Sequence, residues 1–122
     1  QGLRLALDLL YIKAKGGGDG LFHYVLFQLK PELTADVMES LYECTYARLK
    51  ETLPGVIGTS FRRNCILREC NMDVMITVHL KSRETLSQYL QHPLHLKFIE
   101  STHDYVAQRV SFDWAGEEED ND

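Results

Sequence analysis

Residues 89–98 have the sequence YLQHPLHLKF, which groups a tyrosine and two histidines around a proline. Pro93 lacks an amide hydrogen and disfavours helical backbone at the preceding residue, so a helix that runs into His92 must end there. Because proline suits the first position of a helix, a second helix can begin at Pro93. The stretch therefore predicts a corner between two helices, where backbone geometry aims Tyr89 and His95 as a functional site requires.

The segments around this corner predict alternating strands and helices. Side chains alternate along residues 73–80, which places Val74 and Ile76 on one face of a strand. Ser82 is a suitable N-cap for the helix that enters the corner. The pattern predicts a strand over residues 73–80, helices over 83–91 and 93–102, and a last strand over 106–114.

The first half of the chain predicts a strand, a long helix and another strand. In residues 22–30, His23, Val25 and Phe27 share one strand face, and the other face is also largely apolar, so we expect both faces to be covered. Thr34 is a suitable N-cap for a helix that ends at the Pro54-Gly55 pair. Apolar spacing along this helix is carried by Met38, Leu41, Tyr42, Thr45, Leu49 and Leu53. Next come a strand over residues 56–67 and a polar turn over 68–71.

This order of elements predicts an α+β fold of the ferredoxin-like type, an antiparallel sheet with helices on one face. The other face of the sheet would carry Tyr24, Leu26 and Met75 and must also be hidden from water. A second copy of the chain is the simplest cover, so we expect a homodimer that forms an α-β barrel.

Length and composition are those of one globular domain, which we place at residues 21–114. The chain has 122 residues, of which 44% are hydrophobic and 25% charged. Residues 1–20 form a predicted appendage, with a stretch over 3–14 that favours helix and a glycine-rich linker after it. Residues 115–122 are predicted to be an acidic, disordered tail.

Charge and cysteine content restrict partners and compartment. The net charge is -5, four of the carboxylates stand together at residues 117–120, and there is no basic cluster typical of nucleic-acid binding. No apolar run reaches the ~18 residues that a membrane-spanning helix needs. The cysteines, Cys44, Cys65 and Cys70, are odd in number and form no CxxC pair. We expect a cytoplasmic protein with neither nucleic-acid nor membrane partners.

The corner also carries residue types suited to chemistry on a carbonyl compound. A histidine such as His95, with an ordinary pKa of about 6.5, can act as a neutral general base. A phenol such as Tyr89 can donate to the oxygen of a developing enolate. The ligand-binding floor of the predicted pocket consists of His23, Val25, Phe27, Val74 and Ile76.

A metal site is not expected. His92 and His95 stand three apart, with His103 and Asp104 further along the chain. Pro93 separates the first two onto different elements, and no third ligand stands at a characteristic spacing. His92 is expected to brace the corner, and no cofactor is expected.

Three motifs together are typical of one protein family. They are a first strand from His23 to Lys30, a Leu-Pro-Gly-Val turn at residues 53–56 and the run from Ser82 through His92-Pro93 to His95. The pattern resembles the stress-responsive A/B-barrel family, also called dimeric α-β barrel proteins, over residues 22–114. The resemblance implies two sheets that face each other across a dimer axis to form a barrel, with the helices outside.

Functions within this family are diverse, and the resemblance leaves several alternatives open. One member, a plant polyketide cyclase, uses a tyrosine to orient a carbonyl and a histidine as general base, and Tyr89 and His95 match these positions. His23 matches a strand histidine of the same pocket, while Val74 stands where the cyclase has a further histidine.

We expect a homodimeric stress-responsive protein of unsettled biochemical activity, with a small apolar or aromatic ligand in an interior pocket. The alternative is a polyketide-cyclase-like lyase or isomerase in which His95 is the general base and Tyr89 the carbonyl donor. A noncatalytic protein whose stable dimer is itself the function, and a small-ligand carrier, are further alternatives.

Overall fold

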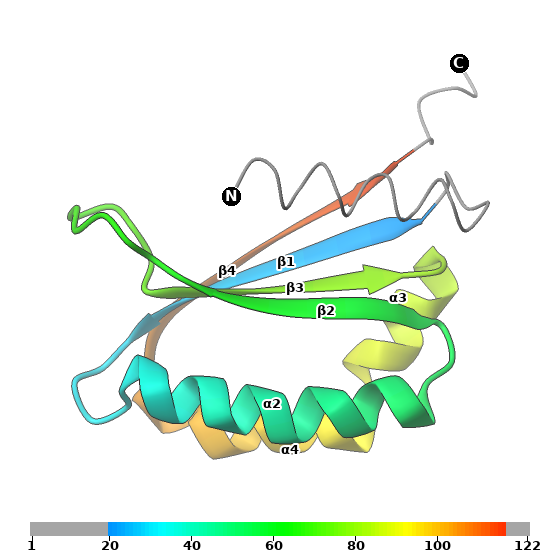
Figure 1. The fold of residues 1–122 in the computed structure, drawn as a ribbon, viewed down its shortest axis with the longest axis horizontal. Helices are drawn as coiled ribbons and strands as arrows, with labels where there is room; N and C mark the ends of the chain where they lie inside the picture. The colour runs from blue at the N-terminus through cyan, green and yellow to red at the C-terminus, as the bar shows by residue number, and fades with distance from the viewer. Residues whose placement is uncertain (1–19, 117–122) are drawn as a thin grey trace.

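The computed structural model describes residues 20–116, in which four strands form one antiparallel sheet with helices on one face (Figure 1). The strand order is β2-β3-β1-β4, so the first and last strands of the chain lie side by side in the sheet. The elements are β1 (Leu21–Leu29), α2 (Ala35–Thr52), β2 (Val56–Arg63), β3 (Val74–Leu80), α3 (Arg83–Leu90), α4 (Pro93–Thr102), the 3-10 helix η1 (His103–Tyr105) and β4 (Val106–Ala115). The predicted ferredoxin-like α+β fold is confirmed.

Each α-helix within the described residues begins at a side-chain cap. The Thr34 hydroxyl accepts from the Val37 amide at 3.2 Å, and the Ser82 hydroxyl accepts from the Thr85 amide at 3.2 Å. At the corner, His92 Nδ1 accepts from the Leu94 amide at 3.1 Å, and Pro93 is the first residue of α4. Caps and proline thus set the start of each helix locally.

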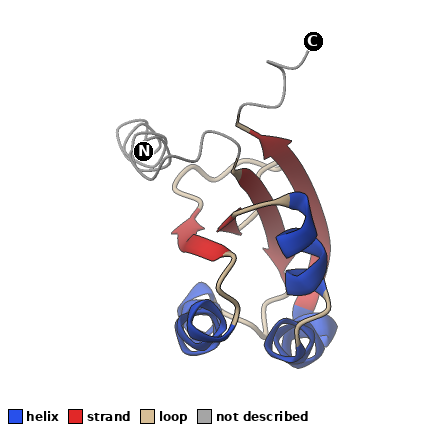
Figure 2. Ribbon diagram, turned by 90° about the vertical axis from the view of Figure 1, so that its right-hand side faces the viewer, coloured by secondary structure: helices blue, strands red, loops and turns tan. Residues whose placement is uncertain are grey.

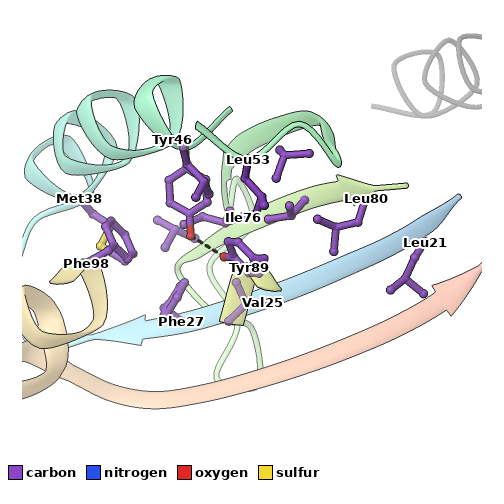
Figure 3. Packing of buried hydrophobic residues seen from close by; sticks show 14 of the residues in the cluster. Leu21, Val25, Phe27, Met38, Tyr46, Leu53, Ile76, Leu80, Tyr89 and Phe98 are labelled. Atoms are coloured by element: carbon purple, nitrogen blue, oxygen red, sulfur yellow. Dashed lines mark hydrogen bonds between the residues drawn. The ribbon is translucent and has the colours of Figure 1, made fainter. Parts of the chain in front are cut away.

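Strand alternation divides the sheet into a helix-covered face and an open face. The helix-covered face of β3 is almost fully buried, with Val74 at 2% exposure and Ile76 at 0%. Met38 and Leu49 of α2 and Phe98 of α4 pack on this face and form the core (Figure 3). The two long helices, α2 and α4, both lie on this side of the sheet (Figures 1 and 2).

The open face of the sheet is rich in aromatic side chains. The ring of Phe22 stacks between His79, at 4.5 Å between ring centroids, and Trp114, at 5.1 Å. Trp114 Nε1 donates to the Tyr24 hydroxyl at 3.1 Å. Phe112 of β4 remains 64% exposed. This face therefore presents apolar surface that no described helix covers.

The second strand is shorter than the sequence predicts. β2 ends at Arg63 and not at residue 67, and the backbone bond from the Asn64 amide to the Asp73 carbonyl closes a loop between β2 and β3. Inside that loop, the Asn64 and Asn71 side chains both donate to the Ile66 carbonyl, at 2.6 Å and 3.0 Å. These side-chain bonds satisfy the backbone locally and compete with the sheet ladder.

Other boundaries and one core position also differ from the prediction: β1 begins and ends one residue earlier than predicted, and β3 begins one residue later. Helix α3 ends at Leu90, one residue early, and β4 includes Ala115, which pairs with Leu21. In α2 the buried position is Tyr46 and not its neighbour Thr45. The expectations for residues 1–19 and 117–122 lie outside the described residues.

Candidate small-molecule site

A cavity of about 600 Å³ lies between the α4–η1 segment and the neighbouring strands β1 and β4. It lies at the edge of the helix-covered face, where β4 is the last strand of the sheet. Its wall is apolar at Val25, Phe27 and Phe98 and polar at His23, Tyr46, His95, Thr102 and Arg109. Lys30, Ile99, His103, Asp104, Val106, Ala107 and Gln108 complete the lining.

His95 lines the cavity from the first turn of α4. Its Nδ1 lies 3.2 Å from the carbonyl oxygen of Leu90, the last residue of α3, so the helix corner orients the ring. Because a carbonyl only accepts, Nδ1 carries the proton in this bond and Nε2 keeps a lone pair. No hydrogen bond between described residues occupies Nε2.

The environment of His95 keeps the imidazole neutral. Burial lowers the pKa of His95 below its usual value near 6.5, and the bond to Leu90 partly offsets this change. The positive charge of Arg109 lowers the pKa of His95 further. A neutral imidazole that lines a cavity and keeps an unprotonated ring nitrogen is chemically a proton acceptor.

Tyr89 lies behind the cavity wall and bonds to a tyrosine that lines it. The Tyr89 hydroxyl is 2.7 Å from the Tyr46 hydroxyl, and the bond joins α3 to α2 (Figure 3). Tyr89 is 0% exposed, and its ring contacts His95 at 4.3 Å between centroids. Burial raises the pKa of Tyr89 to about 12 and that of Tyr46 well above its usual value. Both phenols therefore stay protonated as donors.

His23 reaches the cavity from β1 and is held by an acidic residue of β4. His23 Nδ1 lies 2.6 Å from Asp113 Oδ1, and the two residues are opposite each other in the β1–β4 register. The carboxylate accepts from Nδ1 and fixes the His23 ring, whose centroid lies 5.7 Å from that of the Tyr89 ring in a T-shaped contact. Two oriented imidazoles thus flank the same tyrosine.

The structure brings together four of the predicted site residues at this cavity: His23, Val25, Phe27 and His95. Tyr89 contacts two of them without lining the cavity itself. Val74 and Ile76, predicted as part of the floor, do not line it, because β3 lies under the core and the floor beside β1 is made by β4. That part of the predicted floor is therefore replaced by β4.

Sequence reasoning missed Tyr46, Arg109 and Asp113. The alternation of β4 places Arg109, Ser111 and Asp113 on one side and Val110 and Phe112 on the other. This pattern was visible in the sequence, but its meaning depends on β4 pairing with β1. Tyr46 is the residue after Thr45, which the helical spacing of apolar residues had placed on the buried side of the helix.

The described residues contain no group of three or more His, Cys, Asp or Glu side chains that could hold a metal ion. His92 is engaged in the structure of the corner, since Nδ1 caps α4 and Nε2 lies 3.2 Å from the Thr52 hydroxyl. Within residues 20–116, no helix combines the length and apolar character needed to cross a bilayer.

A second hollow of about 760 Å³ lies on the open face of the sheet. Phe22, Tyr24 and Leu26 line it together with residues of the loop after β2. His23, Tyr46, Tyr89 and His95 do not line it. We therefore take the smaller cavity as the candidate site.

The fold and the cavity define a class: a ferredoxin-like α+β domain with a histidine-lined pocket between its last helix and the edge of its sheet. The model of the Stress responsive A/B Barrel Domain matches residues 21–115, and the chain belongs to this family. No curated protein matches the chain.

Solved structures share the fold at low sequence identity. A dimeric ferredoxin-like protein of unknown function from Thermobifida fusca is 23% identical, with 80% of this chain and 92% of that chain covered and a TM-score of 0.67. A hydroxynitrile lyase from Passiflora edulis is 13% identical, with coverage of 80% and 94% and a TM-score of 0.67. SnoaB, a cofactor-independent oxygenase from Streptomyces nogalater, is 14% identical, with coverage of 79% and 91% and a TM-score of 0.62.

Proposed function

We propose that this protein binds a small, largely apolar carbonyl compound in the α4–β4 cavity and transfers a proton on it, as a lyase or isomerase would. The observation that carries the proposal is the state of His95, a buried imidazole that lines the cavity with Nδ1 bonded to Leu90 and Nε2 unprotonated. The residues of the site provide a base and donors without a metal or cofactor.

The proposed step is proton abstraction beside the ligand carbonyl. His95 Nε2 takes the proton, the electrons of the C–H bond form an enolate, and the enolate oxygen accepts a hydrogen bond from a tyrosine. Because Tyr46 lines the cavity and Tyr89 lies behind it, Tyr89 donates to Tyr46 and Tyr46 donates to the ligand. The imidazolium then returns the proton to a carbon of the enolate, which gives the neutral product and leaves the protein unchanged.

The comparisons support this class of chemistry by analogy. Two proteins with the same fold are described as a hydroxynitrile lyase and a cofactor-independent oxygenase, so the fold accommodates small-molecule reactions. Neither is similar enough in sequence to transfer its substrate. The choice of His95 as base rests on the cavity of this chain.

We further propose that the protein is a homodimer with the open sheet faces paired. The support is the exposed apolar surface around Phe112 and Val110, together with the description of the Thermobifida fusca protein as dimeric. The three cysteines are free and exposed, as suits the proposed cytoplasmic location. A noncatalytic carrier would use the same dimer and cavity without proton transfer.

Deuterium exchange distinguishes a catalyst from a carrier. The wild-type protein should accelerate deuterium uptake from D2O at the carbon next to the carbonyl of phenylacetone, measured by NMR. His95→Gln should reduce this acceleration by about 100-fold or more, because general-base catalysis typically contributes ~10²–10⁴.

His92→Asn is the matched control for this experiment. It removes the imidazole three positions away but keeps an N-cap for α4, so exchange should be unchanged. If His95→Gln folds and exchanges phenylacetone as fast as wild type, His95 is not the base. If wild type binds phenylacetone without accelerating exchange, the carrier alternative holds.

A further inference from the structure

We propose that Arg109 is a recognition residue for a carboxylate on the ligand, so that the compound bound in the cavity is a small apolar or aromatic acid. This inference rests on the proposed binding function of the α4–β4 cavity and specifies its substrate class. Nothing in the chemistry of His95 alone requires an anionic ligand.

Arg109 lies on β4 opposite Phe27 in the β1–β4 register, so both side chains project on the helix-covered side. Both residues line the cavity. The guanidinium of Arg109 makes no hydrogen bond or ion pair with another residue of the described chain. By contrast, Arg63 on the other edge of the sheet bonds to Asp36 and Glu39. Arg109 is therefore a cation at a cavity wall with its donors still available.

The charges around the cavity favour an anion. Lys30 lines the cavity together with Arg109 and adds a second positive charge. The acidic side chain in the lining, Asp104, lies 3.3 Å from His103 Nδ1, and Asp113 bonds to His23 at 2.6 Å. Both nearby carboxylates thus have partners other than Arg109. A planar guanidinium binds a carboxylate through two parallel hydrogen bonds, which fixes orientation as well as charge.

The remaining lining determines the body of the ligand. Along β1, the floor of the cavity runs from Phe27, which lies opposite Arg109, through Val25 to His23. His23 is four residues, or about 13 Å, from Phe27. Phe98 of α4 faces the same space. An acid held at Arg109 would place its apolar body along this floor and its far carbon near His95 and Tyr46. The positive charge also acts on these groups. Burial lowers the pKa of His95 and Arg109 lowers it further, whereas Arg109 only opposes the rise that burial causes in the pKa of Tyr46.

A matched pair of probes tests the proposal with the full chain. Phenylacetate and phenylacetamide have nearly the same shape but differ in charge, and NMR titration measures the dissociation constant of each. Wild type should bind phenylacetate about 10- to 100-fold more tightly than phenylacetamide, as expected for one charge-assisted pair. Arg109→Met should reduce phenylacetate binding to the level of the amide and leave amide binding unchanged.

Arg48→Met is the control, since it removes a positive charge from the exposed side of α2 and should change neither constant. Equal affinity of wild type for both probes would overturn the carboxylate site while leaving cavity binding intact. An Arg109→Met variant that loses no more phenylacetate affinity than Arg48→Met would also overturn it. If phenylacetate binds through Arg109 but His95→Gln leaves phenylacetone exchange unchanged, the anion site stands and only the proton-transfer function fails.

Discussion

At the scale of single residues, His95 couples the folding of the corner to pH. In the unfolded chain its pKa is about 6.5, and burial lowers the pKa of His95 in the folded protein. Below about pH 6.5 the unfolded chain therefore binds a proton that the folded chain does not, so the free energy of unfolding falls as pH falls. Above that pH both states are neutral and this contribution is fully present.

We predict that His95→Gln removes this pH dependence. The free energy of unfolding of wild type minus that of His95→Gln should decrease as the pH is lowered from about 7.5 to about 5. The decrease should be at most ~1.4 kcal/mol per pH unit. Urea denaturation at a series of pH values measures the difference, and other titrating groups cancel between the two proteins. Parallel pH curves for the two proteins would contradict the prediction.

At the scale of elements, the turn between α2 and β2 holds the start of α3 in place. The Gly55 carbonyl accepts from the Lys81 amide at 2.8 Å, which ties this turn to the end of β3. A Cβ atom on Gly55 would overlap the side chain of Thr85, which is 5% exposed and bonds to the cap residue Ser82 at 3.1 Å. The close approach requires glycine at this position.

Gly55→Ala should therefore destabilise the protein by about 1–3 kcal/mol, the usual cost of overpacking. Gly58→Ala is the matched control in the next strand, where an added Cβ meets nothing within 4 Å, and its change should stay within ~0.5 kcal/mol. Urea midpoints of the two variants provide the comparison. A Gly55→Ala variant as stable as Gly58→Ala would show that the Thr85 contact is not tight.

At the scale of the whole molecule, the open sheet face determines assembly. Phe112 is 64% exposed on this face, whereas Val37 is 51% exposed on the outer side of α2. We predict that wild type has twice the mass of one chain by light scattering at micromolar concentration. Phe112→Glu should shift the protein toward monomer, because a carboxylate would be buried against apolar surface in the dimer.

Val37→Glu adds the same charge to an equally apolar position away from the sheet and should leave the dimer intact. A monomeric wild type would contradict the homodimer proposal directly. Dimers that persist in Phe112→Glu but dissociate in Val37→Glu would place the interface on the helices instead of the sheet.

Much of the architecture followed from local signals in the sequence. Thr34, Ser82 and Pro93 set the helix starts because caps and proline act within one turn of backbone. The alternation of β1 and β3 identified the buried faces, as Val25 and Ile76 show. The end of β2 was not predictable in this way, since it depends on the bonds from the Asn64 and Asn71 side chains to the Ile66 carbonyl inside the loop.

The sequence by itself determined the helix corner, the order of the elements and the two histidines that face one pocket. Only the tertiary structure decided what surrounds them. Because β4 pairs with β1, Asp113 meets His23 across 90 positions of sequence and Arg109 joins the cavity wall. Helix packing likewise brought Tyr46 to Tyr89 across 43 positions. Periodicity acts over neighbouring residues, whereas these contacts arise from strand order and helix packing, so the chemical neighbours of His95 emerge only in the folded chain.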